Sequence, residues 1–164
     1  MRGRVIRLVL PLALVVAAVA GTAMAAVATT QSSVGTVKVA KNSKYGTVLV
    51  SASGRTLYRY TSDRKDVNTC KGACAALWPA LVVKSSVKPT AGPGVNAKLL
   101  GTMKHSKGLR QVTYAGFPLY RYSGDQKAGD VKGEGFQGKW YLVNSKGALV
   151  KKPVSTSGGA GGWG

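Results

Sequence analysis

Between residues 37 and 154, apolar and polar residues alternate in short runs that end at glycine and other turn-forming residues, and few stretches have a helical period. Short runs that are rich in valine, threonine and tyrosine predict β-strands. The expected strands are Val48–Ala52, Thr56–Tyr60, Lys98–Lys104, Arg110–Tyr114, Pro118–Tyr122, Trp140–Val143 and Ala148–Lys151. Because short turns such as Ser53-Gly54 separate them, we expect successive antiparallel hairpins.

Two stretches depart from this pattern. Lys71–Leu77, which precedes Pro79, predicts one short helix. Ser85–Asn96 is interrupted by prolines and glycines and is expected to be an internal linker. The predicted fold class is therefore mainly β, with one short helix near the cysteines.

One eight-residue segment occurs twice. Residues 56–63 read TLYRYTSD, and residues 118–125, which lie 62 positions later, read PLYRYSGD. The same offset relates Tyr58 to Tyr120, Tyr60 to Tyr122, Asp63 to Asp125 and Trp78 to Trp140. A chance echo would not also align the tryptophans, so we interpret the chain as two copies of a unit of about 60 residues that share one core. The predicted domain spans 37–154, with repeat one at about 45–84 and repeat two at about 98–150.

The start of the chain has the order of a secretory signal peptide. Three arginines precede an apolar run at Leu8–Ala20, which is short for a membrane span of about 20 residues. Ala23-Met24-Ala25 supplies a cleavage site, and no cysteine follows the run to carry a lipid. We expect export with removal of residues 1–25, a flexible lead at 26–36 and a disordered glycine-serine tail at 155–164.

The net charge of the chain indicates which class of partner such an exported protein would bind. Without the three arginines of the leader, 21 basic residues stand against 5 acidic ones, a net charge of +16. This excess favours polyanions through long-range attraction and counterion release. For an exported protein we expect anionic cell-wall polymers or a membrane surface rather than nucleic acid. The lysines are spread along the chain, so solubility alone is the other interpretation.

The repeated segments resemble a known bacterial family. Tyr58-x-Tyr60-x-x-Asp63 and its second copy are similar to the Y-x-(F/W/Y)-x-x-D motif of the "secreted repeat of unknown function" proteins, many of which are predicted lipoproteins. Cys70-x-x-x-Cys74-Ala75 followed by Trp78-Pro79 resembles that family's cysteine-tryptophan-proline segment. The chain departs from the family in lacking a lipobox cysteine and in having Ala80 where a second proline is usual. The resemblance implies an extracytoplasmic two-repeat fold and no established activity.

The tyrosines of the motif allow two interpretations. Residues two apart in a strand face the same side, so Tyr58 lies beside Tyr60 and Tyr120 beside Tyr122. We favour a buried aromatic cluster whose hydroxyls are hydrogen-bonded at its edge. The alternative is a stacking platform for a sugar or another flat ligand.

The acidic residues are confined to two segments. They are Asp63, Asp66, Asp125, Asp130 and Glu134, and each follows a Tyr-x-Tyr within 14 residues. Asp63 and Asp125 are expected to accept backbone N–H groups and fix the turn after each strand. Other interpretations are neutralisation by Arg59, Arg121 or nearby lysines, a Ca²⁺ site, and the carboxylate pair of a carbohydrate-active enzyme.

The two cysteines predict a disulfide between Cys70 and Cys74, because the chain is exported. The alternative is a copper-binding or redox protein, in which both thiolates act with Met103 and His105, the single histidine. One histidine supports no Ser/His/Asp signature, and no phosphate-binding loop or haem-attachment motif is present. We therefore expect a non-catalytic protein without a cofactor.

Overall fold

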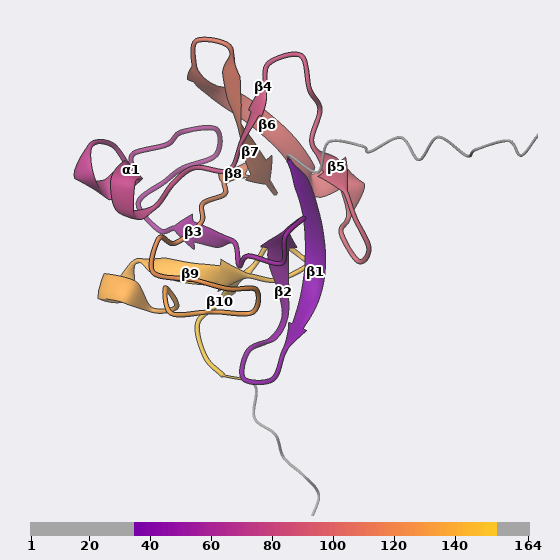
Figure 1. Cartoon of the computed structure of the whole chain (residues 1–164), viewed down its shortest axis with the longest axis vertical. Coiled ribbons are helices and arrows are strands. Elements are labelled where there is room, and N and C mark those ends of the chain that lie inside the picture. The colour runs from indigo at the N-terminus through magenta and orange to yellow at the C-terminus, as the bar shows by residue number, and fades with distance from the viewer. Residues whose placement is uncertain (1–34, 154–164) are drawn as a thin grey trace, which may run out of the picture. The chain divides into compact units, whose positions relative to one another are not determined.

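The structure is a computed structural model in which residues 35–153 are described (Figure 1). The predicted signal peptide, the tail and nearly all of the predicted lead lie outside these residues. Within the described range, no helix is both long and apolar enough to cross a membrane.

The described chain is mainly β and contains one short α-helix. Its elements up to the middle of the chain are β1 (Thr36–Asn42), β2 (Gly46–Ser51), β3 (Tyr58–Tyr60), α1 (Ala73–Leu77), β4 (Val82–Lys84) and β5 (Thr90–Ala91). The remaining elements are the 3-10 helix η1 (Ala97–Leu99), β6 (Leu100–Ser106), β7 (Leu109–Tyr114), β8 (Phe117–Pro118), the 3-10 helix η2 (Phe136–Gly138), β9 (Trp140–Val143) and β10 (Leu149–Val150). The predicted fold class is confirmed, including the short helix next to the cysteines.

These strands form three small sheets that reflect the two repeats. The sheet orders are β2-β1-β5, β10-β9-β3 and β4-β7-β6, and β8 also pairs with β7. The antiparallel hairpin β1-β2 of repeat one corresponds to the hairpin β6-β7 of repeat two. Gly54 and Gly116, which follow β2 and β7, have φ angles of 80° and 82°, so both turns use a backbone conformation that favours glycine.

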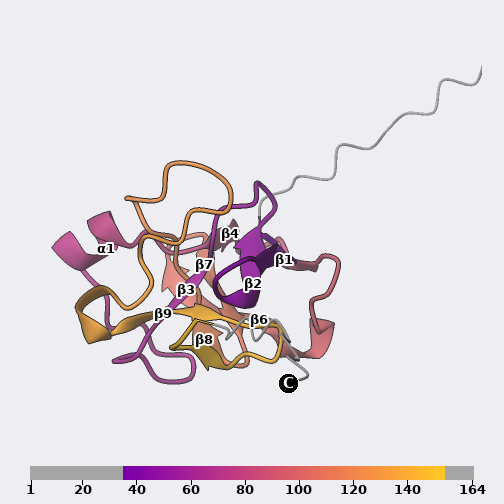
Figure 2. The same cartoon turned by 90° about the horizontal axis from the view of Figure 1, so that it is seen from below.

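The strand that carries each Tyr-x-Tyr segment pairs with the other repeat. In β3, Tyr58 lies opposite Leu142 of β9, and Tyr120 forms the equivalent bridge to Ala80. The two tyrosines also bond each other: the N–H of each donates to the C=O of the other, at 2.9 and 3.0 Å. β3 and β9 lie side by side in both views (Figures 1 and 2). Repeat one thus adds β3 to a sheet of repeat two, and repeat two returns a single bridge at Tyr120.

The core is shared in the same way. One cluster of buried residues comprises Val37, Leu49, Leu57, Leu81, Val83, Val112, Tyr114, Leu119 and Val143. A second comprises Val48, Val50, Tyr58, Cys70, Trp78, Tyr120, Trp140 and Leu142. Both clusters draw on both repeats, so neither repeat has a core of its own.

Two sequence-based predictions need correction at the start of the domain. β1 begins at Thr36, inside the expected lead, and it was not among the predicted strands. The expected linker Ser85–Asn96 contains β5, which pairs with β1 in parallel. The linker prediction was wrong because prolines and glycines mark breaks in regular structure but do not exclude short pairing: Gly92 N–H donates to the C=O of Val37 at 2.7 Å.

The predicted hairpins at the repeated segments are also only partly right. Leu57 N–H donates to the C=O of Leu49 at 3.0 Å, as a hairpin would require, but from Tyr58 onward the chain pairs with β9. The expected strand Pro118–Tyr122 is reduced to β8 and the bridge at Tyr120. Local sequence patterns predict pairing with the nearest strand in the chain. In the structure, these segments instead pair with the other repeat, because both repeats contribute to one core. The predicted strand Trp140–Val143 and its hairpin with β10 are confirmed.

The shared core predicts a single cooperative unfolding transition. Leu57 and Leu119 occupy equivalent positions, and both side chains have no exposed surface. We expect Leu57→Ala and Leu119→Ala each to lower the free energy of unfolding by about 2–5 kcal/mol. In thermal unfolding followed by circular dichroism and tryptophan fluorescence, either variant should shift one coincident transition. Two separate transitions, one for each repeat, would contradict the shared core.

Candidate functional site

The two repeats exchange a hydrogen bond between a tyrosine and an aspartate. Tyr58 Oη donates to Asp125 Oδ2 at 2.7 Å, and Tyr120 Oη donates to Asp63 Oδ2 at 2.5 Å. All four side chains are buried, with at most 6% of their surface exposed. The motif Tyr-x-Tyr-x-x-Asp is therefore closed by the other copy: the tyrosine of each repeat binds the aspartate of its partner.

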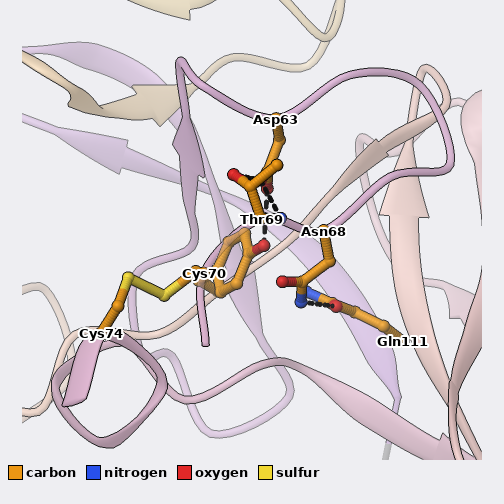
Figure 3. Close-up of a disulfide and its surroundings, with 7 residues drawn as sticks. Asp63, Asn68, Thr69, Cys70, Cys74 and Gln111 are labelled. Carbon is orange, nitrogen blue, oxygen red and sulfur yellow. Dashed lines mark hydrogen bonds between the residues drawn. A yellow bond between two sulfur atoms is a disulfide. The ribbon is translucent and has the colours of Figure 1, made fainter. Parts of the chain in front are cut away.

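Each aspartate also holds the loop that follows it. Asp63 Oδ1 accepts the backbone N–H and the hydroxyl of Thr69, at 2.8 and 2.7 Å, and Asp125 Oδ1 accepts the N–H of Lys132 at 2.9 Å. Figure 3 shows Asp63 directed at Thr69 next to the disulfide. The expected role of both aspartates in fixing a turn thus extends to a loop of six or seven residues.

Burial keeps these tyrosines as donors. Burial, followed by the hydrogen bond to the partner carboxylate, raises the pKa of both Tyr58 and Tyr120 far above the ordinary value. Burial also raises the pKa of Asp125, while the bonds from Tyr58 and the Lys132 N–H oppose that rise. Both effects favour the protonated form of the hydroxyls, which is the form that donates to the carboxylates.

The other tyrosine of each motif takes part in an aromatic stack. Four rings follow one another in the order Tyr60, Trp140, Trp78 and Tyr122, with centroid separations of 4.4, 3.8 and 4.4 Å. The two tryptophans are parallel to within 1° and at most 2% exposed. Members alternate between the repeats at all three contacts, so the stack joins the two copies. It supports the structural interpretation of the tyrosines, because the faces of the inner rings cover one another.

The disulfide holds the loop that leads into this stack. Cys70 and Cys74 are joined with an S–S distance of 2.03 Å, and Cys70 is 2% exposed (Figure 3). The predicted disulfide is confirmed. At the equivalent positions repeat two has Lys132 and Phe136, and the ring of Phe136 packs 5.7 Å from both Trp78 and Tyr122. Aromatic packing thus takes the place of the covalent link.

A small hollow of about 280 Å³ lies next to the stack. Its lining is Tyr60, Ala73, Cys74, Leu77, Trp78, Phe136, Gln137 and Trp140. Apart from Gln137, this lining is apolar and aromatic, and it holds no charged side chain. The ring of Tyr60 is half-buried there. This hollow is therefore the place where a flat ligand could still contact the aromatic residues, as the alternative interpretation requires.

Two further acidic residues bind backbone groups. Asp130 Oδ2 accepts the N–H groups of Gln126 and Lys127, which lower its pKa, and lies 3.8 Å from Lys132 Nζ. Glu134 accepts the N–H of Leu142 at 2.6 Å. Among residues 35–153, the alternative of neutralisation by arginines or nearby lysines is met at Asp130, which pairs with Lys132, and neither Arg59 nor Arg121 forms an ion pair. Arg59 instead donates to the C=O of Gly147 at 2.8 Å.

The residues of the copper alternative are not brought together as ligands. Both sulfur atoms are in the disulfide, whereas Met103 and His105 lie on β6, in the sheet with β4 and β7. Among residues 35–153, no three side chains of the types His, Cys, Asp and Glu are grouped to hold a metal ion. Four of the five carboxylates considered for Ca²⁺ or for glycoside hydrolysis are engaged by tyrosines or backbone N–H groups, and the fifth, Asp66, is exposed.

The Tyr–Asp exchange and the aromatic stack together form the junction between the two repeats. The sequence analysis missed two residues that complete this junction. Gln111 is fully buried, donates to the C=O of Leu119 at 3.0 Å and accepts from Asn68 at 2.6 Å (Figure 3). Gly133 lies so close to Trp78 and Tyr58 that an added Cβ would stand 2.7 Å from the indole. The glycine-rich segment 133–138 was a signal for such close approach, but its partner could not be known from the sequence.

Removing a hydroxyl tests the exchange directly. Tyr58→Phe or Tyr120→Phe leaves a buried carboxylate without one donor, and we expect each to lower the free energy of unfolding by about 1–3 kcal/mol. Tyr141→Phe is the matched control, because its hydroxyl bonds Gly138 C=O at the surface; its effect should be within about 0.5 kcal/mol. A double-mutant cycle of Tyr58→Phe with Asp125→Asn should show coupling, and strict additivity would contradict the contact.

Alkaline titration gives a second test. Because the pKa of both tyrosines is higher in the folded than in the unfolded chain, their contribution to stability is complete below about pH 10 and declines as the pH rises above it. Of the seven tyrosines, we expect at least two to form tyrosinate only as the protein unfolds, as followed by ultraviolet absorbance. The variant with both Tyr58→Phe and Tyr120→Phe should lose this late phase. Titration of all seven in the folded protein would overturn the assignment.

Comparison with known proteins supports the duplication. The family described as "secreted repeat of unknown function" matches the chain twice, at residues 39–82 and 101–144. No curated protein and no solved structure matches the chain. The two matched segments share the 62-residue offset, together cover more than half of the chain and contain both halves of the Tyr–Asp exchange, including the loop residues Thr69 and Lys132. The protein thus belongs to the family of secreted repeats of unknown function.

Proposed function

We propose that the protein is an exported, non-catalytic component of the cell envelope that binds anionic polymers through its basic surface. The observation that carries this proposal is that most acidic side chains form contacts within the domain, whereas the basic side chains greatly outnumber them. All 21 basic residues outside the predicted leader lie within residues 35–153, together with all 5 acidic residues, and most of the acids are committed to internal contacts.

Internal contacts hold four of the five carboxylates, whereas the fifth, Asp66, is exposed. Asp63 and Asp125 are buried in the tyrosine exchange, and Asp130 and Glu134 accept backbone N–H groups. Most lysines, in contrast, are exposed. The surface that a partner meets is therefore more positive than the composition alone indicates, which favours binding of polyanions.

The state of the tyrosines supports a charged rather than an aromatic binding surface. Tyr58 and Tyr120 are buried, and Tyr60 and Tyr122 are stacked on tryptophans, so the repeated motif is used to join the two copies. The family's description as secreted repeats supports an extracytoplasmic location. Polyanions met there are wall polymers and anionic lipid headgroups, and we favour the polymers because the basic residues are spread over the domain rather than placed on an amphipathic helix.

Salt dependence tests the proposal. We expect the secreted protein to bind poly(glycerol phosphate) at low ionic strength and to lose at least about tenfold in affinity between low and physiological salt, because counterions are released on binding. Affinity measured by titration calorimetry over a range of salt concentrations gives the slope, and a neutral polysaccharide such as dextran is the control polymer. Absent binding, or binding that does not respond to salt, would rule the proposal out.

A further inference from the structure

The two repeats differ in how the outer edge of their hairpin is covered. In repeat two, β7 is flanked by β6 on one side and by β4 on the other, with Val83 opposite Arg110. In repeat one, β2 corresponds to β7, yet β2 is the last strand of its sheet. The position that β4 fills beside β7 has no matching strand beside β2 in the described sheets.

The cause lies in the segment that corresponds to β4. Residues 144–146, which follow Val82–Lys84 by 62 positions, form a turn instead of a strand. Asn144 Oδ1 accepts the N–H groups of Lys146 and Ala148, at 2.9 and 3.0 Å, and the Asn144 N–H donates to the C=O of Ala148. These bonds direct the chain into β10 and away from the edge of β2.

A groove of about 570 Å³ lies where the strand is missing. One side is formed by Tyr45, Gly46 and Thr47, at the beginning of β2. The other side is formed by the turn and by the residues around β10, namely Asn144, Ser145, Lys146, Leu149, Val150, Lys151 and Lys152. It is about twice as large as the hollow beside the aromatic stack, which is about 280 Å³.

The lining of the groove has charge of one sign. Lys146, Lys151 and Lys152 contribute three ammonium groups, and none of the lining residues is acidic. Lys44 adds a fourth at the rim, with its Nζ 5.2 Å from the centroid of the Tyr45 ring. None of these lysines forms an ion pair within the described part of the chain. An anion entering the groove would meet cations that no carboxylate compensates.

The remaining lining suits an uncharged segment between anionic groups. Tyr45 presents a half-buried ring, and Leu149 and Val150 are half-buried aliphatic residues. A tyrosine ring and an aliphatic surface can pack against a polyol or a sugar, while lysine ammonium groups bind phosphate as point charges. The groove therefore combines the contacts needed for a polymer in which phosphates alternate with polyol or sugar units.

We propose that this basic groove, between the edge of β2 and the turn at Asn144, is the site at which the protein binds a polyol-phosphate polymer. The proposal rests on the proposed function and locates the polymer-binding site of that function at this groove. It also gives a reason for the divergence of the repeats, because the Asn144 turn keeps open in repeat one the edge that β4 closes in repeat two.

A pair of charge-matched variants tests the site. Lys146→Ala, Lys151→Ala and Lys152→Ala together remove three charges from the groove, whereas Lys84→Ala, Lys104→Ala and Lys107→Ala remove three exposed charges from β4 and the β6-β7 hairpin. For poly(glycerol phosphate), we expect the groove variant to lose about tenfold or more in affinity and about 2–3 in the slope of log affinity against log salt. The control variant should change by less than about threefold, because only long-range attraction is reduced.

Two further measurements identify the occupant. Amide NMR signals of Gly46, Thr47, Ser145 and Lys146 should shift on addition of the polymer, and inorganic phosphate should shift them only at much higher concentration. If vesicles of phosphatidylglycerol and phosphatidylcholine compete equally well at the same lysines, the groove is a lipid-headgroup site and the polymer assignment is overturned. A variant that ends at Pro153 is the second comparison. If its signals already stand at the shifted positions without polymer, the chain's own C-terminal segment normally affects the groove, and the polymer assignment is also overturned.

The outcomes separate this inference from the proposed function. If the wild-type protein does not bind the polymer in a salt-dependent way, the function itself fails. If it binds, but the groove and control variants weaken binding equally, the function stands and the groove is not the site. Circular dichroism of both variants should match the wild type, since all six lysines lie on the surface or the groove rim.

Discussion

The fold depends on a reciprocal bond in which each repeat supplies a tyrosine to the other's aspartate. Tyr58 binds Asp125 and Tyr120 binds Asp63, and the backbones of the two tyrosines bond each other between these contacts. A buried carboxylate without donors is costly, so each aspartate requires the hydroxyl of the opposite copy. Half of the chain consequently cannot satisfy its own motif. The shared clusters of apolar residues and the stacked tryptophans enforce the same dependence through packing.

This arrangement also explains the uneven distribution of charge. Four of the five carboxylates occur where a loop has backbone N–H groups to satisfy or where a tyrosine hydroxyl needs an acceptor, and outside the two acidic segments the charged residues are lysine and arginine. The acids therefore stabilise the inside of the domain, and the basic residues define its outside. An excess of positive charge on an exported protein is then a property of the surface available to partners.

The two repeats are equal where they meet and different elsewhere. At the junction, the pairs of tyrosines, aspartates and tryptophans are related by one offset. Away from it, repeat one has a disulfide where repeat two has Phe136 packed on the stack, and β4 covers the edge of β7 in repeat two while the start of β2 in repeat one borders a groove. Because the junction must satisfy both copies at once, it constrains change, whereas the outer edges are free to diverge and to acquire a specific role.

The sequence by itself determined the β class, the two-copy organisation, the disulfide and the residues that matter at the junction. These follow from local signals: alternation of apolar residues, an eight-residue echo with tryptophans in register, and two cysteines in an exported chain. Only the tertiary structure decided that Tyr58 donates its hydrogen bond to Asp125 rather than to Asp63, and that β3 pairs with β9 rather than with the preceding strand. It also decided that β1 pairs with β5 and that β2 is the last strand of its sheet. The physical reason is that partners within one repeat and partners across two similar repeats give the same local pattern. Choosing between them requires the free energy of the whole shared core, which no single segment contains.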